Sequence, residues 1–327
     1  MPSRVTVNDP LVRIDSRKIE VRSGEIHAVV AVKDEAVRLP DFLEHHRKLG
    51  VDRFFFIDNR STDGTREHLL AEPDCHVFDC SGNFFRSNVH PPLWCNALRN
   101  AFCMDHWCLS LDADELLIHP HHETVGLRAL CAYLDRNGAD ALETPLIDMY
   151  ASGPVRKFQY RRGTSLVESF PYFDRDLGEE VPSPGVCPPI LTFSKFRVRA
   201  FWTGAQRRQR APCITKVGLV RWRYGMNYTT SQHALTAGVL ADIRGALLHF
   251  KFLPGFFEVS RSQTLTNRDL REKGLSEREA YVEALMRNPD LTLMHEGTLR
   301  FEGSGQLVDT GWMRTSAEYE DYVAGVA

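Results

Sequence analysis

Long apolar runs are missing from this sequence of 327 residues. No stretch approaches the roughly 18 to 20 uninterrupted apolar residues that a membrane-spanning helix requires. The first residues, MPSRVTVNDPLVRID, also lack the apolar core of a secretory signal peptide. We therefore expect a cytoplasmic protein, and peripheral contact with the inner face of the membrane remains an open alternative.

Closely spaced cysteine pairs are missing as well. None of the eight cysteines forms a C-x-x-C pair, and several lie inside apolar runs. This pattern favours buried, reduced thiols over a disulfide framework or a zinc ribbon. With 43% hydrophobic and 25% charged residues and no internal repeat, the composition is typical of a globular enzyme with one main domain.

Acidic residues are missing from one long segment. Between Val181 and Ala241 there is no Asp or Glu but there are nine Lys and Arg residues, so the rest of the chain carries −12 for the total to be −3. These cations have no acidic neighbours in sequence. Either they pair with acids elsewhere in the fold, or they bind an anion such as a diphosphate, an acidic sugar or a lipid phosphate.

What the sequence does contain is a regular alternation of apolar runs and helical patterns. Apolar runs at 26–32, 53–57, 75–79 and 107–111 predict strands, with helices between them, and a further strand is expected near 139–147. Such alternation predicts an α/β fold with a mostly parallel central sheet and helices on both faces.

Acidic side chains follow the ends of these predicted strands. Asp34, Asp58, Asp112 and Asp114 each come just after an apolar run. Ligands of open α/β sheets collect outside the carboxyl ends of the strands. A rim of carboxylates would repel a nucleotide phosphate unless a divalent cation lay between them, so we expect a Mg²⁺ or Mn²⁺ site there.

The motif WCLSLDADELL, residues 107–117, gives the sharpest signal. Its apolar strand leads directly into Asp112 and Asp114, and two carboxylates one residue apart can approach one cation that also binds a diphosphate. A second Asp-x-Asp, formed by Asp174 and Asp176, follows no apolar strand and is expected in a solvated turn.

A second motif, FFFIDNRSTDGT, covers residues 54–65. Ser61, Thr62 and Asp63 suit the N-cap of a helix. Asp58 and Asn59 precede this cap at the strand end, where a carboxylate and an amide can bind a base and a ribose. The motif thus combines a structural turn with candidate nucleoside contacts.

Together these motifs resemble the nucleotide-sugar-binding half of GT-A glycosyltransferases, above all family 2 and its bacterial relatives. VVAVKDE, FFFIDNRSTDGT and DADE carry the resemblance over residues 26–120, and the later segments LVRW and GALLHFKF resemble a bacterial branch. The resemblance implies a UDP-sugar donor, with Asp112 and Asp114 at the metal and diphosphate. It also implies that Asp34, Asp58 and Asn59 contact the nucleoside. This chain has Asp-Asn-Arg at 58–60, where the family has Asp-Asp-Gly.

A late histidine is the candidate third metal ligand. His249 lies in the run ALLHFKF, on the same face of a predicted strand as Lys251. A histidine in an apolar run is otherwise a core residue, but GT-A enzymes often take a metal ligand from such a position, and Lys251 would then meet the diphosphate. His233 is the substitute. His119, His121 and His122, which follow the acidic motif, are a further candidate metal cluster, but a proline-interrupted surface loop is the preferred interpretation.

Sugar transfer with inversion, which the likeness to family 2 implies, needs a base that takes the proton of the acceptor hydroxyl. Asp148 is the preferred candidate because it follows the predicted strand near 139–147 and would share a sheet edge with Asp112 and Asp114. A turn-capping role is its structural alternative. The other candidate bases are Glu168, Asp174, Glu179 and Glu180.

Aromatic residues interleaved with the cations of the acid-free segment suggest a saccharide acceptor site, because aromatic faces stack on sugar rings. The same mixture occurs in nucleic-acid-binding proteins, but strand-end acids would repel a nucleic-acid backbone, so we expect no such partner. The aromatic residues concerned are Phe193, Phe196, Phe201, Trp202, Trp222, Tyr224 and Tyr228.

The sequence therefore predicts a metal-dependent glycosyltransferase that moves a sugar from a nucleotide donor to a saccharide or lipid-linked acceptor. A sugar nucleotidyltransferase is an alternative, although VKDEAVRLP lacks its glycine-rich basic loop. A non-catalytic carbohydrate-binding protein of the same fold is another. The expected parts are an N-terminal extension (1–25), a GT-A catalytic domain (26–253, with a nucleotide-sugar half at 26–120 and an acceptor half at 121–253) and a C-terminal helical region with a tail (254–327).

Overall fold

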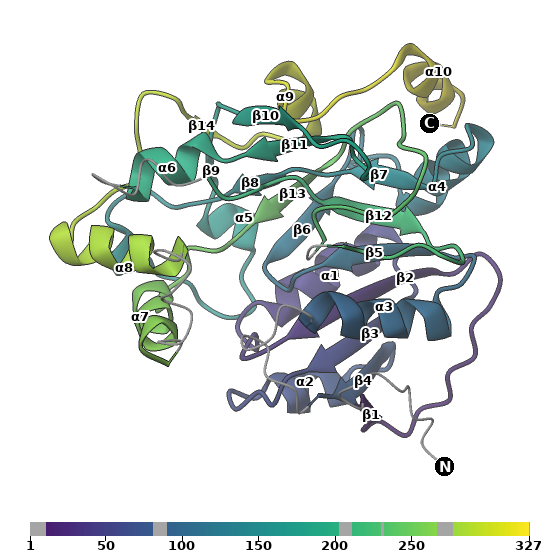
Figure 1. Cartoon of the computed structure of the whole chain (residues 1–327), viewed down its shortest axis with the longest axis horizontal. Helices are drawn as coiled ribbons and strands as arrows, with labels where there is room; N and C mark the ends of the chain where they lie inside the picture. Colours follow the sequence, from purple (N-terminus) through teal and green to yellow (C-terminus); the bar gives the residue numbers. More distant parts are fainter. Residues whose placement is uncertain (1–10, 81–89, 203–210, 230–231, 267–276, 327) are drawn as a thin grey trace.

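The computed structural model describes residues 11–80, 90–202, 211–229, 232–266 and 277–326. A seven-stranded sheet lies at its centre, in the order β1-β4-β3-β2-β5-β12-β7 (Figure 1). Strands β2 to β5 run parallel, whereas β1 and β12 are antiparallel to their neighbours. The strands are β1 (Val12–Arg13), β2 (Ile26–Val32), β3 (Arg53–Asp58), β4 (Cys75–Asp79), β5 (Trp107–Leu111), β7 (Ala141–Glu143) and β12 (Val217–Arg221).

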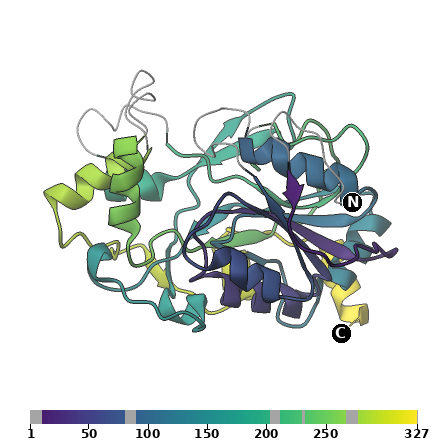
Figure 2. The same ribbon diagram turned by 90° about the horizontal axis from the view of Figure 1, so that it is seen from below.

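Helices cover both faces of this sheet, as the alternating pattern predicts (Figure 2). In β3, Phe54 and Phe56 pack against Phe42 of α1 on one face. Phe55 points to the other face, whose core includes Leu98 of α3. The helices are α1 (Leu39–Leu49), α2 (Thr65–Ala71), α3 (His90–Phe102), α4 (Leu127–Arg136), α5 (Leu166–Ser169), α6 (Lys195–Phe201), α7 (Phe256–Thr266), α8 (Glu277–Arg287), α9 (Ser304–Asp309) and α10 (Ala317–Val326), with a 3-10 turn η1 (Val155–Lys157).

A second, three-stranded sheet positions the acidic motif. Its order is β6-β13-β8, with β6 at Glu115–Ile118, β13 at Ala246–His249 and β8 at Leu146–Asp148. The single strand predicted near 139–147 is therefore wrong: β7 belongs to the central sheet and β8 to the second. Pro145 lies between them and lacks the N–H that a continuous ladder would need.

The remaining strands form two small pairs, and the end of the chain packs into the core. β9 (Tyr172–Asp174) pairs with β14 (Thr298–Arg300), and β10 (Glu179–Pro182) pairs with β11 (Ile190–Phe193). Residues after 287 are more than a polar tail, since Trp312 is buried and Tyr319 of α10 packs on Tyr133 of α4 at 4.8 Å. Core contacts thus extend almost to the C-terminus.

The thiol prediction is confirmed. No disulfide joins any of the eight cysteines, and every one except the partly exposed Cys213 is buried. Burial raises the pKa of Cys75 well above its ordinary range and that of Cys95 to about 12, which keeps both thiols protonated. Within the described ranges, no helix has the length and apolarity needed to cross a membrane.

A buried histidine makes the stability of this fold depend on pH. His27 lies in β2 and stacks on His106 at 4.8 Å, and burial lowers its pKa from 6.5 to about 4. Between these values the unfolded chain takes up a proton that the folded protein does not, so stability falls as the pH falls. The expected loss from this residue is about 2 kcal/mol between pH 7.5 and pH 5.

Urea unfolding at both pH values checks this prediction. The His27→Asn variant should lose about 2 kcal/mol less than the wild type over the same interval, because Asn does not titrate. Equal losses in the two proteins would contradict it. Comparing the pH dependence, rather than one stability value, separates this effect from any change in packing.

Candidate functional site

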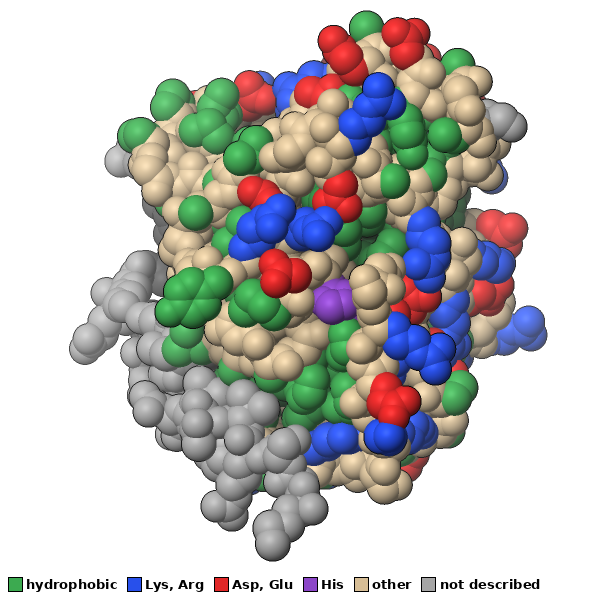
Figure 3. Space-filling model, turned by 90° about the vertical axis from the view of Figure 1, so that its right-hand side faces the viewer, with side chains coloured by type: hydrophobic (Ala, Val, Ile, Leu, Met, Phe, Trp, Pro, Cys, Tyr) green, Lys and Arg blue, Asp and Glu red, His purple; other side chains and the backbone are tan. Residues whose placement is uncertain are grey.

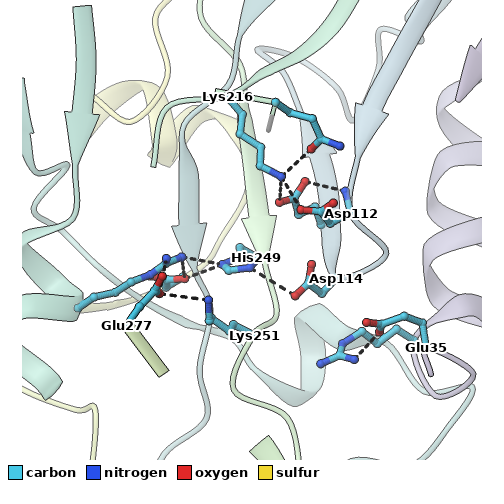
Figure 4. A network of polar contacts seen from close by, with 12 residues as sticks. Glu35, Asp112, Asp114, Lys216, His249, Lys251 and Glu277 are labelled. Atoms are coloured by element: carbon cyan, nitrogen blue, oxygen red, sulfur yellow. Dashed lines mark hydrogen bonds and ion pairs between the residues drawn. The ribbon is translucent and has the colours of Figure 1, made fainter. Parts of the chain in front are cut away.

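The two acids of the Asp-x-Asp motif lie between β5 and β6, where the chain passes from the central sheet into the second sheet. Asp112 keeps 46% of its side chain exposed and Asp114 keeps 20%. They face different partners: Asp112 contacts Lys216, and Asp114 contacts His249 (Figure 4). The motif thus divides its carboxylates between two neighbouring clusters.

Strand register brings His249 to Asp114. On β13, His249 is paired with Glu115 of β6 on one side and with Asp148 of β8 on the other. Its Nε2 atom lies 3.4 Å from Asp114 Oδ2. One donor atom from each of Asp114, Glu115 and His249 lies within 4.8 Å of the others. Protein ligands bind a divalent ion at about 2.0–2.3 Å, which places ligands of one ion within about 4.6 Å, so the group is close to the size of a single-ion site.

Opposite charges keep Asp114 ionised. Burial alone would raise the pKa of Asp114, but the charge and hydrogen bond of His249, with further contributions from Arg38 and Lys216, lower it far below its usual range. Burial would lower the pKa of His249, whereas Asp114 and Asp148 raise it. The group therefore presents an ionised carboxylate beside a histidine whose protonated form the two carboxylates favour.

A buried lysine holds the other carboxylates. Lys216 precedes β12, and its Nζ donates to Asp112 Oδ2 at 2.7 Å, to Gln232 Oε1 at 2.7 Å and to Glu115 Oε1. The second oxygen of Glu115 accepts the backbone N–H of Asp112 at 2.9 Å. Burial raises the pKa of Glu115 to about 7, with Lys216 opposing and Asp112 adding to the shift. Motif spacing alone identified neither Glu115 nor Lys216 as a site residue.

Glu35 and Arg38 form the side of the site next to β2. Glu35 accepts a hydrogen bond from Arg38, whose buried Nε has no hydrogen-bond partner in the described part of the chain. Burial raises the pKa of Glu35 to about 7, the charge of Arg38 opposes this, and Asp114 and Asp112 add to it. The loop after β2 thus contributes a carboxylate and an arginine close to the acidic motif.

Asp148, the predicted catalytic base, lies behind His249. Its Oδ2 accepts from Arg197 Nε at 2.7 Å, and its Oδ1 contacts both Arg197 Nη2 at 2.8 Å and His249 Nδ1 at 2.6 Å. Only 4% of either side chain, Asp148 or Arg197, is exposed. Burial would raise the pKa of Asp148, but the Arg197 charge and these hydrogen bonds lower it far below its usual range.

Lys251 also points to a protein carboxylate. Its Nζ lies 3.2 Å from Glu277 Oε1 of α8, an oxygen that also accepts from Arg197 Nη1 at 3.0 Å and from Tyr281. Burial would raise the pKa of Glu277, but Lys251 and Arg197 lower it to about 2. A chain of charged contacts therefore runs from Lys251 through Glu277 and Arg197 to Asp148 (Figure 4).

The predicted nucleoside residues lie in the loops after β2 and β3. Asp58 is fully buried and pairs with Arg66 of α2 at 2.6 Å. Asn59 donates its side-chain N–H to the carbonyl of Cys80 at 3.0 Å. Asp34 accepts the backbone N–H of Thr62 at 2.7 Å and has a positive φ of 57°. Of these three residues, Asp34 is exposed, whereas Asp58 and Asn59 are buried.

The Ser-Thr-Asp run caps α2 only in part, because Asp63 Oδ1 accepts the backbone N–H of Thr65, the first residue of α2, at 3.0 Å. Gly64 is the N-cap residue, and it makes no side-chain capping bond. Instead, Ser61 Oγ, Thr65 Oγ1 and Asp63 Oδ2 accept three successive backbone N–H groups of the loop after β2, at 2.9, 2.8 and 3.0 Å. These bonds fix the loop that carries Asp34 and Glu35 to the loop after β3.

Acids elsewhere in the fold neutralise the acid-free segment. Six of its nine cations lie in the described ranges, and all six form ion pairs with acids outside the segment, so the first of the two explanations is correct for them. The cations Arg207, Arg208 and Arg210 lie outside the described residues. The pairs are Lys195–Asp176, Arg197–Asp148, Arg199–Asp174, Lys216–Asp112, Arg221–Asp135 and Arg223–Asp140. The same mixing of charges is visible on the face shown in Figure 3.

Most of the interleaved aromatic residues are part of the core, which contradicts their assignment to an acceptor surface. Tyr224 is exposed. The other aromatic side chains pack against core residues, as Phe201 does against Tyr281, with their ring centres 4.7 Å apart. The buried members are Phe193, Phe196, Phe201, Trp202, Trp222 and Tyr228.

The other histidines of the sequence predictions contact groups other than Asp114. His119 is fully buried, which contradicts its assignment to a surface loop, whereas His121 is partly exposed and pairs with Glu320. His233 contacts the carbonyl of Thr215 at 2.6 Å, and burial and the charge of Lys216 lower its pKa to about 4.

Neither a protein family nor a curated protein sequence matches the chain. Solved structures that it resembles include a mycobacterial protein at 19% identity (41% of this chain, 44% of that one, TM-score 0.26) and glucosyl-3-phosphoglycerate synthase from Mycobacterium tuberculosis with phosphoglyceric acid at 19% identity (41% and 46%, TM-score 0.25). The UTP-bound UGPase from Acinetobacter baumannii is similar at 9% identity (92% and 93%, TM-score 0.28). The chain spans less than half of the first two structures, and at these TM-scores all three resemblances are weak. Strand order and helix placement describe a mixed α/β protein consistent with a Rossmann-like fold.

Proposed function

We propose that this protein is a metal-dependent glycosyltransferase of the GT-A type, which transfers a sugar from a nucleotide donor to a saccharide or lipid-linked acceptor. The observation that supports this most directly is the group formed by Asp114, Glu115 and His249 at the carboxyl end of β5. Carboxylates and an imidazole at this edge of a mostly parallel sheet suit a cation that neutralises a nucleotide diphosphate.

The donor atoms fit Mn²⁺ better than Mg²⁺. Mg²⁺ prefers a complete set of oxygen ligands, whereas a mixed carboxylate and imidazole set suits a softer divalent ion. Asp114 and His249 would hold the ion, and His249 would give up its Nε2 proton on binding. When bound, the ion would supply positive charge to the departing diphosphate.

Asp112 and Lys251 are proposed to act beside the ion. The half-exposed Asp112 has one oxygen that Lys216 does not occupy, and it stays available to the ion or the donor. Lys251, held near Glu277, would exchange that carboxylate for a donor phosphate. Asp34, Asp58 and Asn59 remain the predicted nucleoside contacts, on loops that hydrogen bonds fix together.

A thermal-shift screen tests the donor. With nucleoside diphosphates in 100-fold excess over Kd, specific binding adds about 2.7 kcal/mol, which corresponds to a rise in Tm of about 4 °C for a chain of this size. We expect the largest rise with UDP and Mn²⁺ together and a smaller one with UDP alone. A rise with UDP that is equal with and without Mn²⁺ would contradict the metal-dependent site.

Product analysis, together with the same screen extended to saccharides, separates the alternatives. A sugar nucleotidyltransferase would release pyrophosphate from UTP and a sugar 1-phosphate, whereas a glycosyltransferase would release UDP from a UDP-sugar. A carbohydrate-binding protein would be stabilised by saccharides and by no nucleotide. Pyrophosphate release from UTP and a sugar 1-phosphate, or stabilisation by saccharides alone, would replace the proposed function with a different one, whereas UDP release would support it.

A further inference from the structure

Asp148 and His249 form a contact that bears on how the proposed cation site is built. The His249 ring lies between two carboxylates, with Nδ1 at 2.6 Å from Asp148 Oδ1 and Nε2 at 3.4 Å from Asp114 Oδ2. A neutral imidazole carries its proton on one nitrogen and offers a lone pair on the other. The nitrogen that holds the proton therefore decides whether Nε2 can bind a cation.

We propose that Asp148 is a positioning residue that keeps the His249 proton on Nδ1. The Nε2 lone pair then points toward the cation beside Asp114, so this inference rests on the proposed function. An ionised carboxylate can only accept hydrogen bonds, so Nδ1 must donate to Asp148. Histidine ligands of metals commonly donate their second N–H to a carboxylate in this way, which fixes both tautomer and ring orientation.

Arg197 holds Asp148 in the orientation that this requires. Its Nε and Nη2 contact the two carboxylate oxygens at 2.7 and 2.8 Å, and such a two-pronged contact fixes the carboxylate plane. Arg197 Nη2 also lies 3.1 Å from His249 Nδ1, but a nitrogen that donates to Asp148 cannot accept from Arg197. The shorter distance, 2.6 Å, assigns the Nδ1 proton to Asp148.

The same contacts leave Asp148 poorly placed to take a proton from an acceptor. Three donor groups already share its two oxygens, and only 4% of the side chain is exposed. A general base must reach the reacting hydroxyl directly or through one water. A role exerted through His249 needs neither exposure nor a vacant oxygen.

The variant Asp148→Asn tests the proposal with little change in size. In this variant the amide N–H₂ group faces either Arg197 or His249. When the amide oxygen keeps its contact with Arg197, the N–H₂ group donates to His249 Nδ1. Nδ1 must then accept, so the imidazole proton moves to Nε2. We expect Mn²⁺ affinity to fall about 10- to 100-fold when Mn²⁺ is titrated without nucleotide. The Arg197→Lys variant keeps the positive charge but loses the two-pronged contact. Its Mn²⁺ affinity should lie between those of Asp148→Asn and the wild type.

Asp174→Asn is the matched control. Asp174 is also a buried aspartate that pairs with an arginine of α6, Arg199 at 3.1 Å, but it is paired with His295 rather than His249. Its Mn²⁺ affinity should stay within about twofold of the wild type. An equal loss in both aspartate variants would show a general effect of removing a buried charge and would overturn the positioning role.

A spectroscopic readout tests the tautomer without any metal. Long-range ¹H–¹⁵N spectra at a pH where His249 is neutral should show the Nδ1–H form of His249 in the wild type and the Nε2–H form in Asp148→Asn, with the signal assigned by its loss in His249→Gln. An Nε2–H form in the wild type overturns the positioning role whatever the metal does. A wild type in the Nδ1–H form that binds no Mn²⁺ overturns the proposed metal site instead.

Discussion

The Asp114→Asn variant is expected to lose measurable Mn²⁺ binding and to lower Mn²⁺-dependent turnover of the nucleotide sugar by about a thousandfold. The substitution keeps the shape of the side chain but removes its negative charge, which the neighbouring His249 stabilises. Electrostatic stabilisation by a bound ion is worth several kcal/mol, and each 1.4 kcal/mol is a factor of ten in rate. Calorimetric Mn²⁺ titration and the release of UDP from the sugar donor measure the two effects.

Asp176→Asn supplies the control for that prediction, because it changes the corresponding acid of the other Asp-x-Asp. Asp176 is half exposed, and its contact with Lys195 is a surface ion pair at 3.6 Å. Its removal should change neither Mn²⁺ affinity nor turnover by more than about twofold, since exposed pairs contribute little. Wild-type Mn²⁺ affinity in Asp114→Asn would refute the assignment of Asp114 to the cation.

Features that are local in sequence were predictable. The run from Trp107 to Leu111 is apolar because both faces of β5 are covered, and the acids that follow must then lie at its carboxyl end. The parallel β2, β3, β4 and β5 follow from the same reasoning. The strand that carries His249 also follows from its apolar run, but β13 ends at His249, so the prediction that Lys251 lies on the same face of that strand is wrong.

Contacts between distant segments were not predictable from one sequence. Lys216 meets Asp112 across 104 residues and Arg197 meets Asp148 across 49, and their register depends on how β12, β13 and β8 are placed. The acid-free segment did carry a signal, since cations without acidic neighbours must find charge elsewhere. It identified the need for partners, but it left open whether these were protein acids or a bound anion.

The Lys216→Met variant is expected to lose about 3–5 kcal/mol of stability. Lys216 is almost fully buried and donates to Asp112, Glu115 and Gln232, so its removal leaves buried acceptors without a cation. Breaking a buried ion pair from one side typically costs this much, because the remaining charge stays out of water. Urea unfolding at neutral pH measures the loss. Lys195→Met, which removes an exposed lysine of the same segment, should lose less than about 1 kcal/mol.

The double variant Lys216→Met with Glu115→Gln identifies the source of that loss. Asp112 is half exposed and can be hydrated without Lys216, whereas Glu115 is buried and cannot. Neutralising Glu115 in the Lys216→Met variant should therefore recover about half of the lost stability or more. Two independent sites would not show such a coupling, because their effects on the free energy of unfolding would add. If the two substitutions instead add, the lysine stabilises the fold through packing of its side-chain carbons, and the acid-free segment does not serve to neutralise the buried acid beside the Asp-x-Asp motif.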